Sequence, residues 1–299
     1  MCIRDRYDSA RGPPPVVNGV FVVRKDAETD RLIINAKPAN CFFVKPRAVQ
    51  LPTPDVLAEL CLASGAGPHA KLYVSKTDLS DFYHSLLLPE WMTDFFCLPP
   101  VRAGDLEGHD PRDDTLVYPK CLSLPMGWSH SVIAAQIVHE FITQRRGLFA
   151  RAPPLSRLSP NVVVPGQARS QLYIDDFVVY GTDAREVLEV QLEHERAVTD
   201  AGFVVKLSKS VRPQCSPPVK CVGVSVDGTQ LCAGVEPAEL EELRRETLAL
   251  LARRAATGRE LSRIVGGWVW AVSVRRPALS VFNAVYRFMP VSYTHLTLP

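Results

Sequence analysis

Two adjacent carboxylates interrupt an apolar, strand-like stretch of this 299-residue chain. Asp175 and Asp176 stand between the apolar runs 172–174 and 177–180. Two like charges at the edge of a buried sheet repel each other and lose hydration, so they persist most easily when a cation neutralises them. The alternative is a tight hairpin that carries both acids, solvated, at its tip, because aspartate is common in turns.

A second apolar run, residues 72–77, ends at Asp78. Carboxylates at neighbouring strand ends suit Mg²⁺, which accepts one or two of them and keeps room for water and phosphate. Two such ions about 4 Å apart are the usual apparatus for in-line phosphoryl transfer. If the strand ends meet, the three acids therefore predict two-metal chemistry.

The elements expected to position these acids are short strands interleaved with a few helices. Strands are predicted at residues 20–24, 31–35, 72–77, 86–88, 172–174, 177–180, 203–205 and 219–226. Helices, from apolar residues at helical spacing, are predicted at residues 53–63, 129–146, 184–201 and 237–256. Prolines and other residues that break regular structure predict loops at residues 104–120 and 150–170. The pattern indicates an α+β body followed by a mostly helical last third.

Composition is that of an ordinary globular protein, with 46% hydrophobic and 22% charged residues. No apolar run reaches the roughly 18 residues of a membrane span, so we expect no membrane partner. Eight scattered cysteines without a CxxC motif favour an intracellular setting, cytoplasmic or nuclear. Residues 244–287 hold nine arginines and two acids, which suits a polyanion partner or a solvated helix face.

Several motifs, taken in order, resemble a reverse transcriptase. They are YIDD (173–176), TDLSDFYH (77–84) and LPMGWSHS (124–131), with further similar stretches at 22–40, 202–211, 219–228 and 261–282. The motifs most resemble those of long-terminal-repeat or tyrosine-recombinase (DIRS-type) retroelements. The resemblance implies an α+β right-hand polymerase, with fingers and an antiparallel palm sheet over residues 7–232 and a truncated helical thumb over residues 233–290.

The resemblance also implies an activity, RNA-directed DNA polymerisation. Asp78 and Asp175 would bind two Mg²⁺ or Mn²⁺ ions, and Asp176 would be the third carboxylate. A primer 3′-hydroxyl would be extended with dNTPs along an RNA or DNA template. Lys209 would protonate the leaving pyrophosphate, as an ammonium near a developing oxyanion can, and Lys206 is its rival for that role.

The dNTP contacts also come from the resemblance. Arg31 would bind the α-phosphate and Arg24 the outer phosphates, since the guanidinium fork pairs two phosphate oxygens. The alternative is two exposed basic residues on an edge hairpin. Tyr83 would exclude a 2′-hydroxyl, or be a core tyrosine. The backbone N–H groups of residues 79–83 would cradle phosphate oxygens. These residues are Leu79, Ser80, Asp81, Phe82 and Tyr83.

The turn at Met126 and Gly127 departs from the retroviral pattern, which usually has glutamine where Met126 stands. Methionine cannot donate a hydrogen bond to the sugar or phosphate, so substrate affinity becomes less predictable. Gly127 allows a close backbone approach. No RNase H, protease or integrase signature is visible, so the chain resembles a piece of a retroelement polyprotein.

Two competing interpretations remain. One is a catalytically decayed, nucleic-acid-binding remnant of a reverse transcriptase. The other is a structural α+β interaction protein whose acids are solvated turns, which requires Asp78 and Asp175 to lie far apart. The end segments 1–6 and 291–299 resemble translated sequencing-adapter tails, and we expect both to be artefactual.

Overall fold

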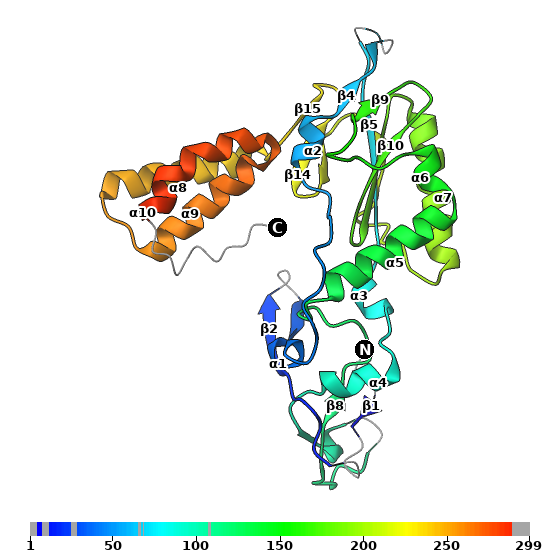
Figure 1. Ribbon diagram of the computed structural model, residues 1–299, viewed down its shortest axis with the longest axis vertical. Helices are drawn as coiled ribbons and strands as arrows, with labels where there is room; N and C mark the ends of the chain where they lie inside the picture. Colours follow the sequence, from blue (N-terminus) through cyan, green and yellow to red (C-terminus); the bar gives the residue numbers. More distant parts are fainter. Residues whose placement is uncertain are drawn as a thin grey trace. The chain divides into compact units, whose positions relative to one another are not determined.

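A computed structural model describes residues 5–7, 12–24, 29–64, 67, 69–106 and 109–288 of the chain (Figure 1). The chain divides into two compact units. The first contains Met1–Gln50, Leu79–Ile142 and Ala197–Lys206, and the second contains Leu51–Asp78, Thr143–Arg196 and Leu207–Pro299. Residues 1–4 and 291–299 of the expected tails lie outside the described residues, so the interpretation of these segments stays a prediction.

The second unit is built on an antiparallel four-stranded sheet in the order β10-β11-β5-β12. Its strands are β10 (Arg169–Tyr173), β11 (Asp176–Gly181), β5 (Tyr73–Asp78) and β12 (Val211–Gln214). Side chains alternate between the two faces of each strand, so each face can bury its own apolar set. Both faces are covered, which is why residues 177–180 of β11 are continuously apolar, whereas β10 buries the polar Ser170 and Gln171.

One face of the sheet packs on helices and the other on a second sheet. Phe177 and Val179 are buried beside Val187 and Val190 of α7 (Ala184–Asp200). On the opposite face, Tyr180 belongs to a cluster that includes the small antiparallel sheet β13-β14-β15. Its strands are β13 (Val219–Cys221), β14 (Val224–Asp227) and β15 (Cys232–Gly234). Figure 1 shows the four-stranded sheet between these layers.

Short elements and a helical pair complete the second unit. The short elements are α2 (Asp55–Ala58), α6 (Leu148–Arg151) and the parallel pair of β4 (Cys61–Leu62) with β9 (Val162–Val163). The helices α8 (Pro237–Arg253) and α9 (Gly258–Ala271) contact each other, and the Trp268 indole donates to Thr247 Oγ1 at 2.8 Å. A kinked 3₁₀ segment (Ser273–Phe282) and α10 (Asn283–Phe288) follow.

The first unit carries a two-stranded hairpin and several short elements. The hairpin is β2 (Gly19–Arg24) with β3 (Asp30–Asn35), and residues 25–28 of its turn lie outside the described residues. The other elements are α1 (Lys37–Asn40), α3 (Phe82–Ser85), α4 (Glu90–Thr93), most of α5 (Ser131–Arg145), β1 (Asp5–Arg6) paired with β8 (Pro119–Lys120), and β6 (Val101–Arg102) paired with β7 (Leu116–Val117). Phe96 is fully buried in its core, with Phe43 and Trp128 packed against it.

The expected α+β character and the helical last third agree with the structure, but several elements differ. The predicted strands 86–88 and 203–205 form only isolated bridges, through Leu87 and Val205. The predicted strand 219–226 is a hairpin, because Val222 and Gly223 both have positive φ, as a type I′ turn requires. The predicted helix 53–63 ends at Ala58, and the predicted loops contain β7, β8 and β9. No helix in the described part of the chain is long and apolar enough to cross a membrane.

Candidate active site

A two-residue hairpin turn presents the adjacent acids. Tyr173 pairs with Asp176, which leaves Ile174 and Asp175 as the turn and makes Asp176 the first residue of β11. The prediction that Asp175 and Asp176 form the turn is therefore wrong by one residue. Ile174 has φ 55°, a conformation that is unusual for a β-branched residue and that costs about 1–3 kcal/mol. Such strained residues cluster at functional sites.

The register of β11 against β5 brings the distant acid to the hairpin. Asp176 pairs directly with Asp78, so their side chains share one face of the sheet. Directly opposite residues in an antiparallel pair have Cα atoms about 4.5–5.5 Å apart. Asp175 adjoins this pair in the turn. The alternative in which Asp78 and the hairpin acids occupy separate regions disagrees with this register.

The cross-strand acids are largely withdrawn from water. Asp78 is 8% exposed, and its backbone N–H donates to Ser210 Oγ at 3.2 Å. One oxygen of Asp176, Oδ2, accepts from Lys76 Nζ at 2.7 Å. The other, Oδ1, is buried and has no hydrogen-bond partner among the described residues.

Burial is the largest cause of the pKa shifts of the hairpin acids. It raises the pKa of Asp176 to about 6; the Lys76 charge opposes this rise, and the charges of Asp175 and Asp78 add to it. Burial also raises the pKa of Asp175, and the neighbouring Asp78 charge raises it further. Two basic side chains, Lys76 and Lys209, lower the pKa of Asp175. The site thus holds three mutually repelling carboxyl groups, and Lys76 is in direct contact with one of them.

The donor chemistry fits a hard divalent cation. Carboxylate oxygens are the ligands that Mg²⁺ and Mn²⁺ prefer, and the buried Asp176 Oδ1 is an acceptor without a donor. Within the described ranges, however, no group of three His, Cys, Asp or Glu side chains converges closely enough to hold a metal ion. The side chain in contact with Asp176 is the Lys76 ammonium.

Lys76 is a site residue that the sequence reasoning missed. It lies two residues before Asp78 on the same strand, and the period of two places both side chains on the same face. That spacing was a usable signal. Lys209 is exposed, and its charge is felt by Asp175. Lys206, its rival, belongs to the first unit.

The segment after Asp78 is tied to its own unit by its backbone. The Ser80 N–H donates to Val204 O at 2.7 Å, so it is already occupied, in contrast to the expectation that it cradles phosphate. Leu79 and Phe82 are buried. Asp81 has φ 48° and immediately precedes α3, while Tyr83 within α3 is half-buried. The nucleotide-binding roles of this segment stay predictions.

The β2–β3 hairpin carries both candidate phosphate-binding arginines. Arg24 pairs with Asp30, and Arg31 pairs with Val23, so the two arginines lie on opposite faces of the hairpin. Both are exposed. Both guanidinium groups could therefore contact the same phosphate group only if it lay at an edge or at the end of the hairpin.

The Met126–Gly127 turn is fixed by a close approach. A Cβ atom on Gly127 would lie 2.4 Å from the backbone oxygen of Ile34. Asn40 bridges the same turn: its Nδ2 donates to Gly127 O at 3.2 Å, and its Oδ1 accepts from Ser129 N at 2.9 Å. Met126 is half-buried. Asn40 was not predicted, because its partner lies 87 residues away and leaves no local signal.

Comparison with known proteins identifies the fold class. No family model and no curated protein matches the sequence. Among solved structures, the chain is similar to a foamy viral protease-reverse transcriptase dRH in complex with double-stranded DNA, with TM-score 0.58 and 16% identity over 90% of this chain and 39% of that chain. The foamy viral protease-reverse transcriptase with an RNA/DNA hybrid gives TM-score 0.57 and 17% identity over 90% and 30%.

A third structure, the same foamy viral protein with double-stranded DNA, gives TM-score 0.57 and 15% identity over 90% of this chain and 47% of that chain. The chain therefore spans less than half the length of these proteins. At this level of identity the similarity shows the fold alone. The fold is reverse-transcriptase-like, with mixed helices and small sheets.

Proposed function

We propose that this chain is an RNA-directed DNA polymerase domain from a retroelement, a nucleotidyltransferase that extends a primer 3′-hydroxyl with dNTPs. The four-stranded sheet would be its palm, the β2–β3 hairpin part of its fingers, and α8–α9 a truncated thumb. The observation that carries the proposal is the Asp78–Asp176 cross-strand pair beside Asp175, on a reverse-transcriptase-like fold.

The residues that would hold Mg²⁺ or Mn²⁺ are Asp78, Asp175 and Asp176. Divalent ions bound there would lower the pKa of the attacking hydroxyl and would neutralise charge on the leaving pyrophosphate. Lys209, exposed near the hairpin acids, would donate a proton to that leaving group. Arg24 and Arg31 would bind the dNTP phosphates from the β2–β3 hairpin.

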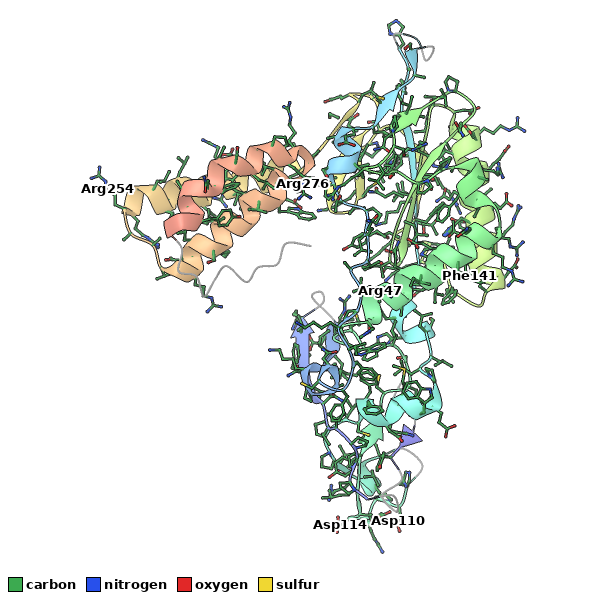
Figure 2. All side chains as sticks on the ribbon, viewed as in Figure 1. Arg47, Asp110, Asp114, Phe141, Arg254 and Arg276 are labelled. Atoms are coloured by element: carbon green, nitrogen blue, oxygen red, sulfur yellow. The ribbon has the colours of Figure 1, made fainter. Side chains whose placement is uncertain are left out.

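The proposed macromolecular partner is a primer paired with an RNA or DNA template. The similar foamy viral proteins are described in complex with double-stranded DNA or an RNA/DNA hybrid. In α8 and α9, Arg244, Arg253 and Arg263 pair with glutamates of the same two helices. Arg254, at the end of α8, and Arg276, in the 3₁₀ segment, are both exposed (Figure 2). Binding through such groups would be salt-sensitive.

The alternative function is that of a nucleic-acid-binding remnant without catalysis. The observation in its favour is that the Lys76 ammonium pairs with one of the three candidate ligands. A permanent ion pair there would prevent metal binding while leaving the fold and its basic surfaces intact.

Primer extension on poly(rA)/oligo(dT) with Mg²⁺ or Mn²⁺ tests the proposed function. The wild-type chain should extend the primer, and the extension rate of Asp175→Asn should be more than about 100-fold lower. Removing even a residue that supports a metal ligand lowers metal affinity or activity by about 10–100-fold. Asp114→Asn is the matched control, because Asp114 is 84% exposed, in the loop between β6 and β7 (Figure 2). Template binding without extension by the wild type would favour the remnant; neither binding nor extension would contradict both functions.

A further inference from the structure

Lys76 is built into the sheet beside the candidate metal ligands. Its cross-strand partners are Val178 on β11 and Val211 on β12, so its aliphatic stem runs between apolar neighbours on the face that carries Asp78 and Asp176. Val178 is two residues from Asp176, which makes Lys76 and Asp176 diagonal neighbours. Their side chains are each 17% exposed and meet at 2.7 Å.

This contact differs from the ion pairs on the protein surface. In Lys220–Glu239, another lysine pair of the second unit, the side chains are 52% and 47% exposed. Exposed pairs of this kind contribute little, because water screens both charges. At the hairpin, water is largely excluded, and Lys76 offsets the charge of acids that would otherwise repel one another. Removing one partner of a shielded pair leaves an uncompensated charge, which is costly.

A divalent ion and the Lys76 ammonium compete for the same carboxylate. Lys76 occupies Oδ2 of Asp176, whereas Oδ1 is buried and unpartnered. An ion on Oδ1 and Asp78 would face a fixed positive charge across a single carboxyl group. Like charges so close repel strongly where water is scarce. The lysine stem has several rotatable bonds, so the ammonium can leave without rearrangement of the strands.

We propose that Lys76 is a tethered counter-ion that holds Asp176 when no divalent ion is bound and must release it for the site to fill. This inference rests on the proposed function, since it concerns the same carboxylates. Lys76 is a positioning residue, and it makes divalent-ion binding weaker than the acids alone would. Conversely, it keeps the hairpin acids together in the metal-free protein.

The first test measures Mn²⁺ binding to the whole chain by calorimetry. Lys76→Met keeps the length and apolar stem but removes the charge, and the Kd for Mn²⁺ should fall by about five- to 150-fold, the usual range of coupling between two ligands. Lys76→Arg, which keeps the charge, and Lys220→Met, which removes an exposed lysine, should not tighten binding. Unchanged or weaker Mn²⁺ binding by Lys76→Met would overturn the inference.

A second measurement needs no variant to fold. Reductive methylation of the wild-type protein, followed by peptide mass spectrometry, should label Lys76 faster at saturating Mn²⁺ than in metal-free buffer. Lys220 is the internal reference and should not change. An unchanged Lys76 rate while Mn²⁺ binds would overturn the inference but leave the proposed function standing. Tighter Mn²⁺ binding by Lys76→Met without primer extension by wild type or variant would support the inference and contradict the polymerase.

Discussion

We expect the buried carboxyl group of Asp176 to lower the stability of the metal-free protein as the pH rises to neutral, and Asp176→Asn to remove this pH dependence. Burial raises the pKa of Asp176 to about 6 in the folded protein, from 3.8. The folded state therefore holds this proton more tightly than the unfolded chain. The resulting stability is fully present below pH 3.8 and is lost as pH rises through about 6.

The size of the effect follows from the two pKa values. A difference of one in pKa corresponds to about 1.4 kcal/mol, so the rise from 3.8 to about 6 gives at most about 3 kcal/mol. This is an upper limit, because 17% of the side chain remains exposed and water screens part of the charge. Asparagine resembles the protonated acid at every pH. The free energy of unfolding of Asp176→Asn relative to wild type should therefore rise between pH 4 and pH 7.

Urea denaturation in metal-free buffer at several pH values between 4 and 7 measures this difference. Subtracting wild type from variant removes the titration of the other acids, and Asp114→Asn, on an exposed loop, should give a difference that does not follow the same curve. A constant difference would refute the reasoning that burial dominates. A difference that falls with rising pH would show that the Lys76 ion pair stabilises the charged form more than burial opposes it.

Three further predictions concern positions outside the hairpin. Gly127→Ala should lower the free energy of unfolding by about 1–3 kcal/mol in urea denaturation, because its Cβ would lie 2.4 Å from Ile34 O; an unchanged stability would contradict the close approach. Gln191→Leu removes a donor shared by backbone oxygens of β5 and β12, and should lower the free energy of unfolding by about 2–4 kcal/mol. Backbone hydrogen exchange in the variant should become faster in β12 than in β10. Equal protection of the two strands from exchange would contradict that bridge. Tyr83→Ala should increase ribonucleotide incorporation in primer extension if the ring lies under the sugar, and unchanged discrimination would favour a packing role.

Strand β11 was predictable because burial on both faces makes its residues 177–180 apolar. The residue at which the hairpin turns was not. Turn preferences favour aspartate and disfavour β-branched residues, so they place the turn at Asp175 and Asp176, whereas the structure uses Ile174 with positive φ. The tertiary pairing of Asp176 with Asp78 outweighs that local preference. The one-residue shift matters, because it decides which acid faces Asp78.

Other parts of the site lacked a local signal. Strand β12 contains Pro213 and polar residues, and it forms only because β5 offers an edge to pair with. The Gln191 side chain of α7 donates hydrogen bonds to both of these strands. One acceptor, the Lys76 carbonyl oxygen, lies 115 residues away in the sequence. Lys76 itself could have been found, since a period of two from Asp78 points to it. The arginines of the β2–β3 hairpin could be placed on the hairpin, but which face each occupies depends on a register that sequence spacing does not fix.

The most direct test of the account is the position of bound Mn²⁺ in a crystal of the whole chain. An anomalous difference map should show manganese beside Asp78, Asp175 and Asp176, with the Lys76 ammonium withdrawn from Asp176. An Mn²⁺-soaked crystal with no anomalous peak at these acids, and Lys76 still paired with Asp176, would contradict it.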